Sequence, residues 1–135
     1  MNYCLDTDAI IDYLKGFPSS VDYLRSLDAA GDTLCISDVV VAEVLAGIPE
    51  TRRDATREFL QSLWFLPMTF AEAYQAGVWR YDYARRGTTL TTTDCLLAAL
   101  ATTHHAALIT ANTKDFPMPE LQLAALPRAQ GGGSG

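Results

Sequence analysis

The chain has 135 residues, the size of one domain, and nearly half of them are hydrophobic, which is enough to fill a single core. No apolar run approaches the roughly 20 residues of a membrane-spanning helix, so we expect no membrane partner. The formal charge of -6 argues against nonspecific nucleic-acid binding through an overall basic field, although arginines cluster locally.

The two ends of the chain and its cysteines suggest a cytoplasmic protein. The N-terminus enters a strand-like run without a basic segment or a cleavage-site pattern, so we expect no signal peptide. Cys4, Cys35 and Cys95 are odd in number and lie among apolar neighbours, which predicts buried free thiols. We interpret residues 1–128 as one domain and residues 129–135 as a flexible tail of linker composition.

Short apolar strands alternate with helices along the chain. In chain order we expect a strand at 3–5, a helix ending at Gly16, a helix at 19–30, a strand at 33–37, a helix from the N-cap Ser37 to Gly47, a helix from Pro49 to about Leu63, a strand at 64–67, helices at 71–86 and 92–104, a strand at 107–110, a polar loop, and an edge strand at 121–126. This order predicts an α/β fold with a mostly parallel central sheet of about five short strands flanked by helices. In such sheets ligands bind beyond the carboxyl ends of the strands.

The first strand ends in an unusual pair of acids. In "YCLDTDAIIDYL" (3–14), Asp6 and Asp8 lie where the strand pattern gives way to a helical one. One aspartate there is explained as a helix N-cap, for which Asp is strongly preferred. A cap does not explain the second carboxylate.

Two further acids lie on apolar helix faces. Glu43 in "SDVVVAEVLAG" and Asp94 in "TTTDCLLAALA" have apolar side chains three and four residues away, where an unpaired carboxylate is costly. Each has a simpler explanation. Glu43 can reach water from the margin of its face, and Thr91 with Asp94 fits a capping box at a helix start.

A last polar segment follows the strand "ALIT". It contains Asn112 and Asp115, so acids and amides recur in four segments that the predicted topology brings to one edge of the sheet. Carboxylates placed together repel one another and require a cation. Oxygen ligands without supporting His or Cys favour Mg²⁺ or Mn²⁺, and we expect His104 and His105, at the far end of their helix, to take no part.

The segments "LDTDAIIDYL", "SDVVVAEVLAG", "TTTDCLLAALA" and "LITANTKDF" together resemble the PIN-domain ribonucleases, specifically the VapC-type toxins of bacterial toxin-antitoxin systems. The resemblance extends from Asn2 to about Pro127. It implies a PIN-like fold and a cytoplasmic endoribonuclease toxin that uses Mg²⁺ or Mn²⁺ to hydrolyse RNA phosphodiester bonds.

The resemblance also implies roles for individual residues. The candidate catalytic and metal-binding residues are Asp6, Asp8, Glu43, Asp94, Asn112 and Asp115. Within that set Asp6, Glu43 and Asp94 match the acidic triad, and either Asn112 or Asp115 completes the site. Thr7 and Thr110 match hydroxyl residues that the family often keeps beside the metal.

Two positions depart from the family pattern. Asp8 stands where Asn or Ser is more common, which adds negative charge, and Ala111 stands where a basic residue is common. We therefore expect other cations to contact phosphate. The candidates are Arg80, Arg85, Arg86 and Lys114.

The family further implies a homodimer and a cognate antitoxin that inserts a helix into an apolar groove and an arginine beside the acids. The segment from Pro49 to Leu63 and the helix expected after it, at 71–86, are the candidates for that groove, although most of their apolar side chains are expected in the core. The RNA substrate (tRNA, rRNA or mRNA) is not specified by any pattern in the chain.

Two alternatives remain. One is a catalytically inactive PIN fold that binds RNA or protein, because a fold does not fix a function. The other is a haloacid-dehalogenase-type phosphatase, because "LDTDAI" also resembles the Asp-x-Asp loop of that class. The later lysine and acidic pair of those phosphatases have no counterpart in this sequence.

Overall fold

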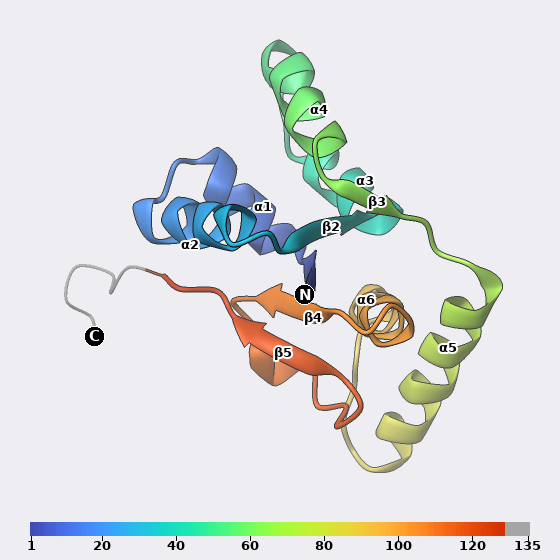
Figure 1. The fold of residues 1–135 in the computed structure, drawn as a ribbon. Helices are drawn as coiled ribbons and strands as arrows, with labels where there is room; N and C mark the ends of the chain where they lie inside the picture. Colours follow the sequence, from blue (N-terminus) through green and yellow to red (C-terminus); the bar gives the residue numbers. More distant parts are fainter. Residues whose placement is uncertain (129–135) are drawn as a thin grey trace.

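Five short parallel strands form the centre of the protein, and helices cover both faces of the sheet (Figure 1). The computed structural model describes residues 1–128, so the predicted tail at 129–135 lies outside the described residues. The strand order is β3-β2-β1-β4-β5. The strands are β1 (Asn2–Leu5), β2 (Thr33–Ser37), β3 (Trp64–Leu66), β4 (Ala107–Thr110) and β5 (Gln122–Ala125).

Six α-helices and two 3₁₀ turns connect these strands. They are α1 (Thr7–Leu14), α2 (Pro18–Ala29), α3 (Asp38–Ala46), η1 (Glu50–Arg52), α4 (Arg53–Gln61), α5 (Phe70–Arg85), α6 (Thr92–Thr103) and η2 (Thr113–Asp115). The predicted α/β class and the order of elements are confirmed, and the main difference is that the helix expected after Pro49 begins as a 3₁₀ turn. Within residues 1–128, no helix has both the length and the apolar character needed to cross a bilayer.

Local signals in the sequence account for several helix ends. Ser37 caps α3, since its Oγ accepts a hydrogen bond from the backbone N–H of Val40 at 3.1 Å. Gly31 and Gly87 follow α2 and α5 with φ of 87°, a backbone conformation that side chains disfavour. These signals explain why the predicted boundaries lie within a few residues of the observed ones.

The sheet separates two hydrophobic cores because successive strand residues point to opposite faces. Leu5, Ile36 and Ile109 pack toward α1, α2 and α3. Their neighbours Cys4, Cys35 and Leu108 pack toward α5 and α6. All three cysteines are buried free thiols, as predicted, and burial raises the pKa of the Cys4 thiol to about 12.

The two central strands define where a ligand can reach the sheet. The chain leaves β1 into α1 on one face, whereas it enters β4 from α6, which packs in the core on the other face. β1 and β4 are hydrogen-bonded neighbours, so their carboxyl ends lie side by side at a topological switch point. Asp6 follows the first of these strands, and Thr110 ends the second.

Candidate active site

A cavity of about 580 Å³ lies beyond the carboxyl ends of β1 and β4. It brings together side chains from all four acidic segments of the sequence, and they come from the β1–α1 junction, from α3, from the first turn of α6 and from the loop after β4. The predicted site residues that line it are Asp6, Thr7, Asp8, Glu43, Asp94 and Asn112. The predicted convergence at one edge of the sheet is therefore what the fold produces.

Asp6 is held between the two central strands. Its Oδ1 accepts from the backbone N–H of Thr7 at 2.8 Å, and its Oδ2 accepts from the hydroxyl of Thr110 at 2.8 Å. Burial raises the pKa of the Asp6 carboxyl to about 6, and the charges of Asp8 and Asp94 act in the same direction. Asp6 is thus both the N-cap of α1 and a carboxylate whose ionised form is destabilised by its surroundings.

Asp8, the second acid of the opening motif, is hydrogen-bonded to the loop after β4. Its Oδ2 accepts from the backbone N–H of Ala111 at 3.1 Å and from Nδ2 of Asn112 at 3.0 Å, so Asp8 anchors the loop after β4. Its Oδ1 is buried and has no hydrogen-bond partner within residues 1–128. Burial raises the pKa of Asp8, against the effect of the Ala111 hydrogen bond.

Asp94 projects from the first turn of α6 without capping it. Thr91 is the cap, because its Oγ1 accepts from the backbone N–H of Asp94 at 3.1 Å. The carboxylate of Asp94 lines the cavity. Burial raises its pKa, the hydrogen bond with the Thr91 side chain acts in the opposite direction, and the charges of Asp115, Glu43 and Asp8 raise it further.

Glu43 lies at the exposed rim of the cavity. Its Oε1 accepts from the hydroxyl of Thr7 at 2.7 Å, which links α3 to the start of α1. Of the two interpretations that the sequence allows for Glu43, the structure has the one at the margin of the apolar face, because α3 buries Val40 and Val44 and leaves Glu43 exposed. Its carboxylate needs no buried partner in this position.

The loop after β4 offers two candidates for the fourth position. Asn112 lines the cavity, whereas Asp115 is exposed in η2 and does not line it. Asp115 acts on the site through its charge, which raises the pKa of Asp94. This arrangement favours Asn112 as a direct ligand and Asp115 as a more distant acid.

The arginines predicted to contact RNA make other interactions. Arg80 donates through Nε to the carbonyl of Leu90 at 3.0 Å and through Nη1 to Thr92 at 2.8 Å, while Arg85 and Arg86 lie over the rings of Tyr81 and Tyr83. The described lining of the cavity includes neither these arginines nor Lys114.

The cavity contains an ion pair that the sequence did not indicate. Asp12 and Arg128 line it together with Lys15, and Arg128 Nε donates to Asp12 Oδ2 at 2.8 Å. Asp12 lies one helical turn after Asp8 on α1, a spacing that places both on one face of the helix. The spacing of Asp8 and Asp12 could have indicated that Asp12 faces the site. No local pattern could have indicated Arg128, because it is 116 residues from Asp12 in the sequence.

The donor set of the cavity suits a hard divalent cation. Its lining residues offer carboxylate, amide and hydroxyl oxygens, and no His or Cys among the described residues joins them. The unpartnered Oδ1 of Asp8 is an oxygen that a cation would satisfy. Within residues 1–128, no group of three or more acids is close enough together to hold a metal ion by itself. Mg²⁺ does not require such a group, because it usually keeps several bound waters and binds one or two carboxylates.

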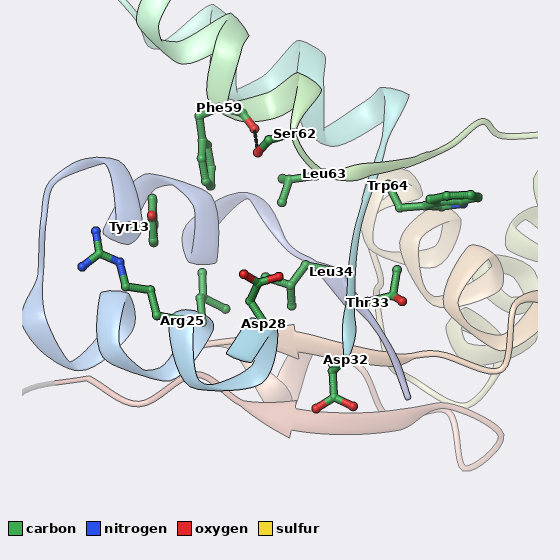
Figure 2. Close-up of a pocket in the computed structure, with 11 residues that line it drawn as sticks. Tyr13, Arg25, Asp28, Asp32, Thr33, Leu34, Phe59, Ser62, Leu63 and Trp64 are labelled. Carbon is green, nitrogen blue, oxygen red and sulfur yellow. Dashed lines mark hydrogen bonds between the residues drawn. The ribbon is translucent and has the colours of Figure 1, made fainter. Parts of the chain in front are cut away.

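Two other cavities flank α4. One of about 460 Å³ lies between α1, α2 and α4, where the rings of Tyr13 and Phe59 stack at 4.6 Å (Figure 2). The other, of about 800 Å³, lies between α3, α4 and β3. It is lined by the apolar side chains of Val41, Leu45, Leu60, Leu63 and Phe65 and by charged side chains of α4.

Thr110→Val should test the role of the buried hydroxyl. The change removes the donor to Asp6 and the acceptor for the backbone N–H of Asn112, which lie at 2.8 and 3.1 Å. We expect a loss of about 1–2 kcal/mol in the free energy of unfolding and, for any metal-dependent activity, a roughly tenfold loss. Thr110→Ser, which keeps the hydroxyl, is the control and should retain most of the activity; equal losses in both variants would assign the effect to packing.

The family model described as the PIN domain matches residues 3–118 of this chain. Over 121 residues the chain is 33% identical to Ribonuclease VapC19 of Mycobacterium tuberculosis, a match that covers 87% of this chain and 95% of that protein. It is 27% identical over 121 residues to the tRNA(fMet)-specific endonuclease VapC of Shigella flexneri, with 86% of this chain and 90% of that protein covered.

Solved structures of similar fold include toxin-antitoxin complexes. One is VapBC2 from Rickettsia felis bound to a DNA fragment from their promoter, with a TM-score of 0.81, 26% identity, and coverage of 94% of this chain and 100% of that chain. Another is VapBC-1 from nontypeable Haemophilus influenzae, with a TM-score of 0.79, 26% identity, and coverage of 93% and 98%.

Proposed function

Because this chain belongs to the PIN-domain family and is an endoribonuclease of the VapC type, we propose that it cuts RNA in the acidic cavity with the help of Mg²⁺ or Mn²⁺. As a toxin of this type it is inhibited by a cognate antitoxin. The observation that carries the proposed site is the convergence of Asp6, Asp8, Asp94 and Asn112 at the carboxyl ends of β1 and β4. We place the activity in the cytoplasm, where the RNA substrate is found.

The proposed ligands of the cation are Asp6, Asp8, Glu43, Asp94 and Asn112, directly or through water. When bound, the cation supplies the positive charge that offsets the carboxylates and polarises the phosphate of the substrate. Thr110 fixes the orientation of Asp6, and Asn112 and the Ala111 amide fix that of Asp8. These contacts keep the acids oriented before the substrate arrives.

The proposed reaction is hydrolysis of the RNA backbone by a water molecule. A water oxygen attacks the phosphorus of the RNA backbone, the bond from phosphorus to the 3′ oxygen breaks, and a carboxylate of the cavity accepts the proton of the water. The departing 3′ oxygen takes up a proton from solvent. The products are one RNA end with a 3′-hydroxyl and one with a 5′-phosphate.

The chemistry of the RNA ends tests this reaction. Fragments made by the purified chain in Mg²⁺ should accept a 5′ label only after phosphatase treatment, because each new 5′ end carries a phosphate. New ends that are 5′-hydroxyl, with 2′,3′-cyclic phosphates on the other side, would indicate attack by the 2′-hydroxyl of RNA and would contradict hydrolysis by water.

The substrate class is tRNA, rRNA or mRNA, and we take tRNA as the first to test because one relative is named for a tRNA. Arg80, Arg85, Arg86 and Lys114 remain proposed phosphate contacts outside the cavity. Arg80 holds the segment before α6, so it acts on the position of Asp94 as well as offering charge to the RNA.

We place the antitoxin in the 800 Å³ groove between α3, α4 and β3. Its partly exposed apolar side chains, with Arg53 and Arg57 at the margin, suit an amphipathic helix of the partner. In Figure 1, α3 and α4 project from the edge of the sheet, where such a helix has access. The groove falls mainly on the segment that the sequence singled out.

Phe65→Glu should weaken antitoxin binding by about tenfold or more, because it adds a charge to an apolar groove at a side chain that is 51% exposed. The measurement is the amount of antitoxin that co-purifies with the tagged chain after co-expression. Phe17→Glu is the matched control, since Phe17 is 46% exposed and lies outside the groove. Equal loss in both variants would argue against this groove.

We further propose that the chain forms a homodimer through α5. Four large hydrophobic side chains of this helix are exposed and recur at helical spacing. They are Phe70, Tyr74, Val78 and Tyr81. An apolar stripe of this kind is typical of protein–protein contacts.

A further inference from the structure

Arg128 brings a guanidinium to the rim of the acidic cavity from the far end of the chain. Its Nε donates to Oδ2 of Asp12 at 2.8 Å. The side chain of Asp12 is 6% exposed, whereas that of Arg128 is 49% exposed. One partner of the ion pair is therefore buried, and the other remains accessible to a ligand.

Two hydrogen bonds fix the backbone before Arg128. The N–H of Leu126 donates to the carbonyl of Thr110 at 2.9 Å, and the hydroxyl of Ser20 donates to the carbonyl of Pro127 at 3.4 Å. Leu126 is itself buried in the core beside α1. The chain thus crosses from β5 to α2, and this path brings Arg128 over Asp12.

The Arg128 guanidinium has N–H donors that make no hydrogen bond within residues 1–128. Arginine carries five N–H groups, and within residues 1–128 the side chain of Arg128 makes one hydrogen bond, through Nε. Arg128 and Asp8 line the same cavity, so the guanidinium lies beside the acids. Arg80, by contrast, already donates through Nε and Nη1 to the segment before α6.

The acidic cavity has few cations to offset its repulsion of phosphate. The described lining of the cavity has five carboxylates, and its two cations are Lys15 and Arg128. The chain as a whole has a net charge of -6 and repels phosphate, so local cations must guide the backbone of RNA. The forked guanidinium of arginine suits phosphate, and a buried carboxylate that holds one edge of the fork reduces the entropy lost on binding.

We propose that Arg128 binds a phosphate of the RNA substrate at the rim of the cavity and that buried Asp12 positions its guanidinium for this contact. The proposal rests on the proposed ribonuclease function, which it extends by naming a substrate contact. It also supplies a cation near the loop in which Ala111 replaces the basic residue expected from the family.

The test measures binding of bulk tRNA, without cleavage, to full-length chains that carry Asp94→Asn, over a series of salt concentrations in Mg²⁺. Removing Arg128 alone would leave Asp12 as an unpaired buried charge, so the main variant is Arg128→Ala combined with Asp12→Asn. We expect its Kd for tRNA to rise about tenfold and the slope of log K against log salt to fall by about one. Arg25→Ala, which removes an exposed cation from α2, is the control and should change neither.

Two further variants separate substrate contact from stability. Arg128→Lys keeps the charge without the fork and should recover part of the affinity, and Asp12→Asn alone should give a smaller loss. In chains with Asp94 intact, the Arg128 variants should raise KM for RNA and leave kcat within about twofold.

Each other outcome overturns the assignment. Unchanged tRNA affinity and salt slope in the double variant, beside a wild-type chain that cleaves RNA, would show that the ion pair only supports the fold. Tighter binding or faster cleavage without Arg128 would show that it blocks the cavity. If the wild-type chain neither binds nor cleaves RNA, the proposed function fails together with this inference.

Discussion

Asp94→Asn should lower the rate of RNA cleavage by about a hundredfold or more while the chain keeps its fold. The carboxylate lies in the cavity and contributes to the negative charge that the proposed divalent cation would offset. The helix does not need it, because Thr91 Oγ1 caps α6. Asparagine keeps the shape of the side chain and removes its charge, so loss of activity without loss of structure follows from the geometry.

The measurement is the initial rate of tRNA cleavage in Mg²⁺, with circular dichroism and a thermal melt to check the fold. Asp22→Asn makes the same change of charge at an exposed position on α2 and should leave the rate unchanged. Activity within about fivefold of wild type in Asp94→Asn would remove this residue from the catalytic set.

Asp6→Asn should stabilise the metal-free protein at neutral pH, although it removes a carboxylate of the proposed catalytic site. The pKa of Asp6 is about 6 in the fold and 3.8 ordinarily, so between these values the folded chain binds more protons than the unfolded chain. The contribution of Asp6 to the free energy of unfolding is therefore greatest below pH 3.8. It falls as the pH rises through about 6. Asparagine avoids this loss, because it stays neutral.

The expected gain for Asp6→Asn at pH 7.5 in chelator is on the order of 2 kcal/mol, less than the full pKa shift implies because Asp6 is partly exposed. This corresponds to about 5 °C in Tm, and at pH 4 or below the two proteins should melt together. Added Mg²⁺ should raise the Tm of the wild type above that of Asp6→Asn, because the wild type binds the ion more tightly. A lower Tm for Asp6→Asn at every pH would mean that hydrogen bonds to the carboxylate outweigh its burial.

The order of elements could be predicted because the sequence marks them locally. The N-cap Ser37, the glycines Gly31 and Gly87, and the short β-rich runs "TLCIS" and "ALIT" each specify one boundary or strand. Parallel pairing then follows from the alternation of strands and helices, and it places Asp6 and Thr110 at one edge of the sheet.

The sequence left open whether Glu43 is exposed, because α3 is apolar on most of its surface. Val40 and Val44 face the core, whereas Val41 and Leu45 line the groove toward α4. The periodicity of the sequence therefore does not say which side is buried. Where a helix has two apolar surfaces, the packing of the neighbouring elements determines which surface is buried.

The ion pair of Asp12 and Arg128 was missed for a different reason. The two residues are 116 positions apart and meet only because the chain after β5 returns to α2. No local pattern carries that information. The arginine clusters that are visible in the sequence lie elsewhere, one on η1 and α4 and the other on α5 and its C-cap, where Arg85 and Arg86 lie over aromatic rings.

The most direct test of a metal-dependent ribonuclease is cleavage of total tRNA and a panel of structured RNAs by the purified chain in Mg²⁺, in excess chelator, and after Mn²⁺ is restored. Discrete fragments should form with Mg²⁺, stop forming in chelator and form again with Mn²⁺. The same fragments in chelator would contradict the role of the metal, and the absence of fragments from every RNA, with metal bound to the chain, would indicate a binding module instead of an enzyme.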